Sequence, residues 1–173
     1  MEAVILEGVD KVLAHLNPRA YMQALNRTIN DVGSKTKTRL SKGVRRTYNI
    51  KAGDLNKFMK VRKSRYSDIR YTIDVRSRRF NAMRFGAKVL KQRGNVSVKI
   101  RKDTGRKVLK RAFTAKNGAV LQRVKGAQEI RAVTTVSIPQ MFNDKLLKDA
   151  DKHAQKELRT SLQNNFNYYI GKA

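Results

Sequence analysis

Histidine and cysteine are the residue types most able to define a chemical site, and this sequence offers few of them. His15 and His153 lie near opposite ends of the 173 residues, each in a segment of helical periodicity without a nearby set of ligands. A metal site needs three or four such groups at suitable spacing, so we interpret both as surface or helix-packing histidines. The chain has no cysteine, which excludes disulfides and thiolate metal sites.

The aspartates are the second set of candidates. Asp149 and Asp151 are two positions apart on an expected helix, where their side chains diverge, and we interpret them as solvated charges. A metal-dependent nuclease could use Asp68, Asp74 and Asp103, but these come from separate segments crowded by cations. No glycine-rich phosphate loop is present. The sequence therefore predicts no enzyme, and it implies no metal and no other cofactor.

The charge of the chain is strongly positive and unevenly distributed. Lys and Arg number 40 against 13 acidic residues, a formal charge of +27. Residues 32–128 contain 30 of the basic and four of the acidic residues, which gives +26. A polyanion would relieve this self-repulsion, and nucleic acid is the default partner class. Because no recognition helix is evident, we expect contact with the phosphate backbone without sequence specificity.

The cations concentrate in two runs, residues 60–79 and 99–113. A charge run is usually a solvated face, but these cations fall in rows that could follow a phosphate backbone. The aromatic residues near these cations are interpreted as core residues and not as platforms for base stacking; they are Tyr66, Tyr71, Phe80 and Phe85. The predicted DNA-facing basic surface consists of Arg76, Arg78, Arg79, Arg101, Lys102, Arg106, Lys107, Lys110 and Arg111.

Periodicity predicts the elements that hold these residues. Asn17-Pro18 starts a helix well, and apolar residues then recur at a spacing near 3.6 as far as Tyr48. A shorter helical segment follows at 52–61, with Asp54 as its cap. From residue 66 the period changes to two, and Asn117-Gly118 predicts a hairpin with a type I′ turn.

A second change of period occurs at a single proline. Residues 129–138 predict a last strand, and a closing helix has apolar residues on one face from Leu147 to Tyr169. Proline disfavours helical backbone at the preceding Ile138, so we expect the strand to end there. The predicted strand-helix joint consists of Pro139, Met141 and Phe142.

Together these elements predict an α+β fold in a single domain over residues 1–173, an antiparallel β-sheet with long N-terminal and C-terminal amphipathic helices packed on it. Phe142 shares a helical face with Leu146 and Ala150, which directs it toward the core. Residues 1–16 are interpreted as a first helix, because acidic Glu2 stands where a secretory signal needs positive charge. No segment is predicted to span a membrane.

Five short blocks follow one another along the chain, "ALNRT", "YNIKAGDLNKFMKV", "MRFGAK", "AFTAKNGAVLQRV" and "SIPQMF". In this order and spacing, over about residues 20–142, they resemble the minor tail protein Z family of tailed bacteriophages. The resemblance implies a non-enzymatic virion structural protein, a tail completion or neck component at the head-proximal end of a long tail. It also implies a ring of copies, hexameric by analogy with tail symmetry, that helps join tail to head around the path of the DNA.

The expected partners are therefore other copies of the chain, the tail terminator or tail tube, head-connector proteins and the DNA backbone. The expected locations are the virion and, during assembly, the host cytoplasm. The alternative is a cellular nucleic-acid-binding protein of ribosomal or nucleoid type, since charge and size would suit it equally. Such proteins often carry disordered basic extensions, so the nearly neutral, amphipathic end segments favour the assembly interpretation.

Overall fold

The computed structural model describes residues 17–91 and 95–170, which divide into two compact units. Unit 1 contains the described parts of Met1–Leu40, Val61–Asp74 and Asp144–Ala173. Unit 2 contains those of Ser41–Lys60 and Val75–Asn143. The predicted first helix at residues 1–16 lies outside the described residues.

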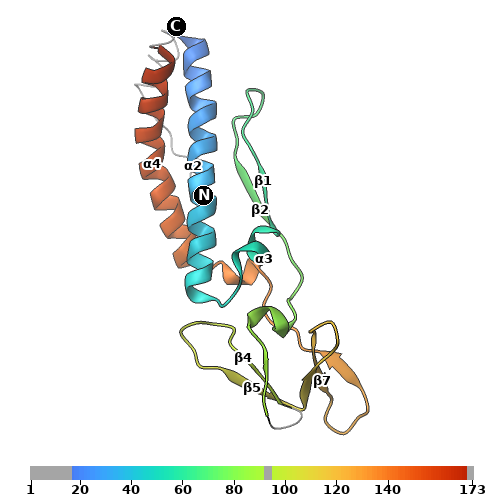
Figure 1. Cartoon of the computed structure of the whole chain (residues 1–173). Helices are drawn as coiled ribbons and strands as arrows, with labels where there is room; N and C mark the ends of the chain where they lie inside the picture. Colours follow the sequence, from blue (N-terminus) through green and yellow to red (C-terminus); the bar gives the residue numbers. More distant parts are fainter. Residues whose placement is uncertain (1–16, 92–94, 171–173) are drawn as a thin grey trace. The chain divides into compact units, whose positions relative to one another are not determined.

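Unit 1 is built mainly from the long helices and unit 2 mainly from short antiparallel strands (Figure 1). The helices are α2 (Pro18–Thr47), α3 (Ala52–Asn56) and α4 (Asp144–Ile170), and the 3-10 turns are η1 (Ala82–Phe85) and η2 (Pro139–Met141). The strands are β1 (Met59–Arg62), β2 (Thr72–Val75), β3 (Lys88–Val89), β4 (Asn95–Val98), β5 (Lys107–Lys110), β6 (Ala112–Thr114), β7 (Val120–Arg123) and β8 (Ile130–Ala132). The predicted α+β class is confirmed. The strands form three small sheets where one was expected, in the orders β1-β2, β3-β4-β5 and β6-β7-β8.

The first long helix begins where the sequence predicts it. Asn17 Oδ1 accepts the backbone N–H of Ala20 at 3.0 Å, which caps the helix, and Pro18 occupies the first helical position. The predicted cap of the next helix is wrong, because the N-cap of α3 is Lys51. Asp54 lies within α3, where its carboxylate forms an ion pair with Arg84.

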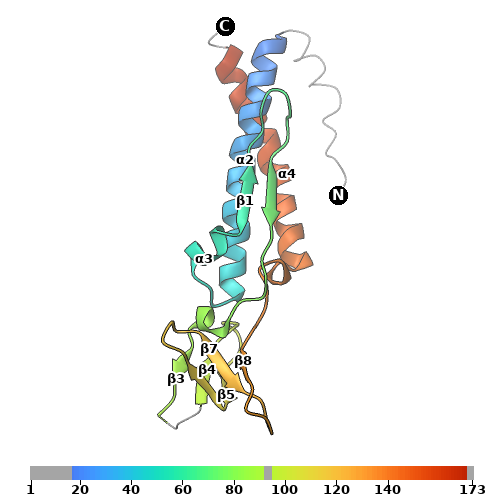
Figure 2. The same cartoon turned by 90° about the vertical axis from the view of Figure 1, so that its right-hand side faces the viewer.

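Helices α2 and α4 lie side by side in unit 1 (Figures 1 and 2). Thr28 is fully buried between them, and its hydroxyl donates to the Ser161 carbonyl at 3.3 Å and accepts from Asn165 at 2.9 Å. An apolar cluster formed by Ala24, Leu162 and Phe166 continues the contact. Leu147, which the periodicity placed on the buried face of the closing helix, is 46% exposed. That prediction is wrong.

The core of unit 2 lies between η1 and the two three-stranded sheets. It consists of Ala82, Val96, Val98, Ala112 and Val120, each at most 2% exposed. Asn81 ties η1 to β7, because its side-chain oxygen accepts the N–H of Val120 and its amide donates to the carbonyl of the same residue, both at 2.9 Å.

The β6–β7 hairpin is confirmed, but the predicted type I′ turn is wrong. A type I′ turn needs a positive φ at both Asn117 and Gly118. Gly118 has a φ of +79°, but Asn117 does not have a positive φ, because Arg111 is the only described non-glycine residue that does. The N–H of Gly118 donates to the Ala115 carbonyl at 2.8 Å, and that of Ala115 donates to the Ala119 carbonyl at 2.9 Å. The turn is a type I turn followed by a left-handed glycine, the usual geometry of a three-residue hairpin loop.

The joint before α4 differs from its predicted geometry. Ile138 has helical backbone angles, φ −61° and ψ −45°, although it precedes proline. Two hydrogen bonds hold it there, because its N–H donates to Ser77 Oγ at 2.8 Å and its carbonyl accepts from Met141 at 2.9 Å. Regular strand pairing ends earlier than expected, at Ala132. Met141 is 1% exposed, whereas Phe142 is only partly buried, so Met141 is the core residue of this joint.

Candidate nucleic-acid interface

The positive charge of the chain is divided unequally between the two units. Counted over the full sequence, the ranges of unit 2, residues 41–60 and 75–143, contain 24 Lys and Arg and three acidic residues, a formal charge of +21. The ranges of unit 1, residues 1–40, 61–74 and 144–173, contain 16 Lys and Arg and ten acidic residues, which gives +6. The helical unit is thus close to balanced, and the sheet unit carries most of the excess.

All three acidic residues of unit 2 are already paired with arginines. The pairs are Asp54 with Arg84, Asp103 with Arg101, and Glu129 with Arg131. The hydrogen bonds from Arg101 lower the pKa of the Asp103 carboxyl. Unit 2 therefore has far more cations than carboxylates, and its net positive charge favours an external anion.

All nine residues of the predicted DNA-facing basic surface are exposed, and all belong to unit 2. Six of them follow one another around the β4–β5 hairpin, and the other three lie in the connection between β2 and η1. The loop between β4 and β5 is fixed to the end of α2, because the N–H of Lys102 donates to the Thr47 carbonyl at 2.8 Å. The Arg101 guanidinium also lies over the Tyr48 ring, 5.7 Å from its centroid.

Strand β5 presents cations on both of its faces. Lys110 shares a face with Val108, which is 53% exposed, because side chains alternate along a strand. Lys107 lies opposite Val98 and shares the face of Leu109, which packs on the core of unit 2. Both lysines are exposed, so only Lys110 fits the expected outward row of cations.

Arg106 has a structural role that its place in a charge run does not indicate. Its guanidinium donates to the hydroxyl and the carbonyl of Ser97, at 3.1 and 2.8 Å, and to the carbonyl of Gly86 at 2.6 Å. Ser97 is 4% exposed. Arg106 therefore satisfies buried polar groups of the sheet, and only its charge is left for a partner.

The connection between β2 and η1 is held by backbone hydrogen bonds at Phe80, directly after its arginines. Phe80 forms two backbone hydrogen bonds with the segment that follows β8: its carbonyl accepts from the N–H of Thr135 at 2.7 Å, and its N–H donates to the carbonyl of Val136 at 3.2 Å. Phe80 itself is 7% exposed. Arg78 and Arg79 precede it and are exposed, so they extend from an anchored backbone.

The aromatic residues near the cations divide into two groups. Phe80 and Phe85 are buried and Tyr71 is partly buried, in agreement with the prediction that they are core residues. Tyr66 is 60% exposed, so the same prediction for Tyr66 is wrong. It lies at the tip of the β1–β2 hairpin, and the cations around it lie outside the predicted DNA-facing set. The exposure of these cations is evident only from the fold, and no pattern in the sequence indicated it.

The candidate catalytic aspartates do not form a site. Asp68 and Asp74 belong to unit 1 and Asp103 to unit 2, where it is bound to Arg101. Asp149 accepts two hydrogen bonds from Arg39, both at 3.0 Å. Within residues 17–91 and 95–170, no group of three His, Asp or Glu residues could hold a metal ion.

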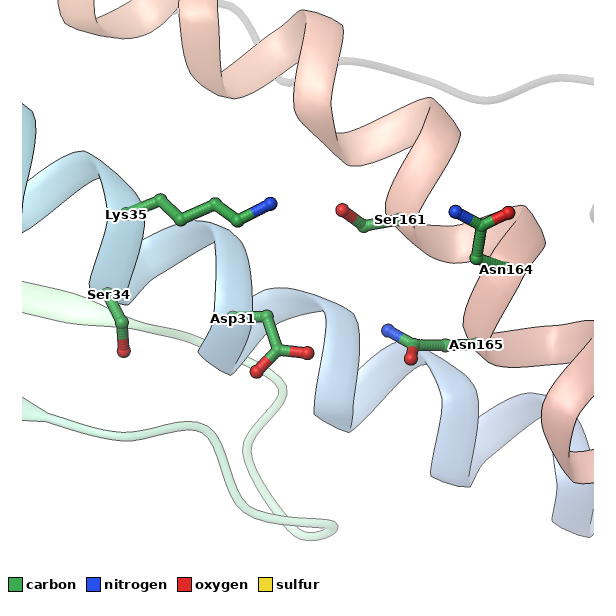
Figure 3. Close-up of a pocket in the computed structure, with 6 residues that line it drawn as sticks. All are labelled: Asp31, Ser34, Lys35, Ser161, Asn164 and Asn165. Atoms are coloured by element: carbon green, nitrogen blue, oxygen red, sulfur yellow. The ribbon is translucent and has the colours of Figure 1, made fainter.

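A polar pocket of about 350 Å³ lies between α2 and α4 (Figure 3). Lys35 extends into the space between the helices, and its ammonium donates to Glu157 at 2.6 Å. An ammonium held in an ion pair does not serve as a general base for a neighbouring serine. The Lys35–Glu157 ion pair beside this pocket joins α2 to α4. It is lined by Asp31, Ser34, Lys35, Ser161, Asn164 and Asn165.

Comparison with known proteins places the chain in a family. In the part of the chain that the structure describes, no helix is long and apolar enough to cross a membrane. No curated protein and no solved structure matches the chain. The family model described as prophage minor tail protein Z (GPZ) matches residues 3–172, nearly the whole length. The family is one of structural phage tail proteins and not a known class of enzyme. The chain therefore belongs to the prophage minor tail protein Z family.

Proposed function

We propose that this tail protein is a tail completion or neck component at the head-proximal end of the phage tail. Copies of it form a ring, with six subunits by analogy with tail symmetry, and the ring helps to join tail to head around the path of the DNA. Within the ring, unit 2 directs its basic surface toward the phosphate backbone. Assembly takes place in the host cytoplasm before the protein becomes part of the virion.

The observation that carries this proposal is the division of charge between the units. Unit 2 has a formal charge of +21, and its three carboxylates are already paired with arginines. A nearby polyanion would relieve the repulsion among its cations. Duplex DNA presents one negative charge per about 1.7 Å of its axis. The +6 unit is better suited to contacts with other proteins, because bringing copies of it together costs less electrostatic repulsion. Its expected neighbours are further copies, the tail terminator or tail tube, and head-connector proteins.

Binding to duplex DNA tests the proposed surface. Charge reversal at Arg78, Arg79, Lys107 and Lys110 to Glu should weaken binding to several unrelated sequences alike and reduce its salt dependence. The matched control reverses four exposed lysines of α4 and changes net charge by the same amount. It should weaken binding much less, because it leaves unit 2 intact. The control lysines are Lys145, Lys148, Lys152 and Lys156.

Two further measurements test the ring and its place in the virion. Native mass spectrometry of isolated tails should find several copies of the chain in one complex, and a single copy per tail would contradict the ring. Phage carrying the four reversals in unit 2 should assemble tails that fail to form infectious joined particles. Normal infectivity together with lost DNA binding would show that the DNA contact has no part in joining.

A further inference from the structure

The β1–β2 hairpin extends along α2 as an arm whose outer part, residues 61–74, belongs to unit 1 (Figure 2). Asn30 of α2 forms a matched pair of hydrogen bonds with the backbone of the arm. Its side-chain oxygen accepts the N–H of Ser64 at 2.9 Å, and its amide donates to the carbonyl of Ser64 at 3.2 Å. Ser64 is 5% exposed. One polar side chain of α2 thus satisfies both backbone groups of a buried residue in the arm.

A second contact between the arm and α2 depends on a glycine. The Tyr71 ring packs on Gly33 so closely that a Cβ there would lie 2.3 Å from Tyr71 Cγ. Only glycine allows a ring this near the helix backbone. Because Ser64 follows β1 and Tyr71 precedes β2, the two contacts together fix both sides of the arm on α2.

The tip of the arm is a short turn closed by backbone hydrogen bonds. Arg65 and Asp68 donate to each other's carbonyls, both at 3.0 Å. Tyr66 and Ser67 are the two residues of the turn, and both are exposed. The tip is therefore held in one conformation by its own hydrogen bonds.

Cations line a pocket of about 660 Å³ at this tip. Its one acidic residue, Asp68, lies 3.6 Å from the Arg70 guanidinium, which offsets its charge. Among the described residues, no carboxylate lies within ion-pair distance of the three remaining cations. Those three are Arg62, Lys63 and Arg65.

We propose that the tip of the arm is a second binding site for nucleic acid, one that contacts backbone phosphates through Arg62, Lys63 and Arg65. This site rests on the DNA contact of the proposed function and extends it from unit 2 to unit 1. Arginine, lysine, serine and tyrosine are the side chains that commonly contact phosphate oxygens, and the exposed Tyr66 and Ser67 lie between these cations and Arg70 in the sequence. The anchoring on α2 means that no ordering of the arm opposes binding.

Nucleic acid explains these features better than an acidic protein surface does. The chain carries a formal charge of +27, and unit 2 has a large net positive charge of its own. A protein patch neutralises a few charges, whereas duplex DNA offers phosphates continuously along its length. Duplex DNA therefore offers phosphates for the arm in addition to those that unit 2 contacts.

Fluorescence anisotropy with a short duplex DNA, measured on the full chain over a range of salt concentrations, tests the site. Replacing Arg62, Lys63 and Arg65 with Gln should make the negative slope of log affinity against log salt shallower by about 2 to 3, since each phosphate contact contributes about −0.9. The matched control, K145Q/K148Q/K152Q, has the same net charge and should leave the slope near that of the wild type. Circular dichroism confirms that both variants are folded.

A second variant separates the arrangement of the cations from their number. Asn30→Ala removes both hydrogen bonds to Ser64 and keeps every cation, so it should weaken DNA binding at unchanged net charge. The site is refuted if the Gln variant binds like its control, or if Asn30→Ala binds like the wild type. In either case, the proposed function is retained if the four charge reversals in unit 2 still weaken DNA binding. A wild-type chain that binds no DNA would overturn both.

Discussion

Replacing Gly33 with alanine measures how firmly the arm is seated on α2. In an ordinary helix this change is favourable by about 1 kcal/mol, because glycine loses more backbone freedom than alanine on folding. Here the new Cβ would lie 2.3, 2.4 and 2.6 Å from three carbons of the Tyr71 ring. Carbon atoms in contact are normally about 3.5 to 4.0 Å apart. The ring must therefore move away by about 1 Å or more.

The size of the effect follows from these two opposing terms. Inserting a carbon into a packed site typically costs about 1 to 3 kcal/mol. After the gain in helix propensity, the net change for Gly33→Ala is a loss of about 0 to 2 kcal/mol in the free energy of unfolding. In a Tyr71→Ala background the obstacle is absent, and the same substitution should stabilise by about 1 kcal/mol. The double-mutant cycle should then give a coupling of about 1 to 3 kcal/mol between the two positions.

Urea unfolding followed by far-UV circular dichroism provides these free energies. Gly53→Ala is the matched control, because Gly53 lies in α3 and a Cβ there meets nothing within 4 Å. That control should stabilise the chain by up to about 1 kcal/mol. Equal stabilisation by Gly33→Ala and Gly53→Ala would refute the packing of Tyr71 on α2.

Two further predictions concern the joint and the helix pair. Met141→Ala should cost about 2 to 5 kcal/mol in thermal or urea unfolding, and Phe142→Ala should cost less, because Phe142 is only partly buried; the reverse order would contradict this assignment. The hydrogen bond from Lys35 lowers the pKa of Glu157 below its ordinary value of 4.5, so the pair stabilises the fold above that pH and its contribution is lost as pH falls through the lowered pKa. Unfolding at stepped pH should show a smaller loss on acidification for Glu157→Gln than for wild type, and identical profiles would exclude this pair as a source of acid sensitivity.

Several features of the protein follow from the sequence alone. The start of α2 was predictable from Asn17-Pro18, because a cap and a fixed φ act over a few residues. Val96 and Val98 recur at the strand period of two that begins at residue 66, and both are buried in β4. The family was recognisable because short blocks keep their order along the chain, whatever their contacts in space.

Other features depend on contacts between residues that are distant in the sequence. Ile138 adopts helical backbone before a proline because Ser77, 61 residues earlier, accepts its N–H. Arg106 is bound to Ser97 and Gly86, so an arginine in a charge run is also part of a sheet. A residue before proline prefers extended backbone, so the local rule predicts the wrong conformation for Ile138. No local rule predicts the hydrogen bonds of Arg106.

The distribution of charge shows the same limit. The sequence places +26 in residues 32–128 as one block, but the fold assigns residues 32–40 and 61–74 of that block to the helical unit. The sheet unit then carries +21, and the cations of the arm are presented separately from it. Composition and local patterns fixed the total charge and most of the helices, because both depend on neighbouring residues. Which cations share a surface was decided only by tertiary packing, because it depends on hydrogen bonds and close contacts such as Asn30 with Ser64 and Gly33 with Tyr71 that join distant segments.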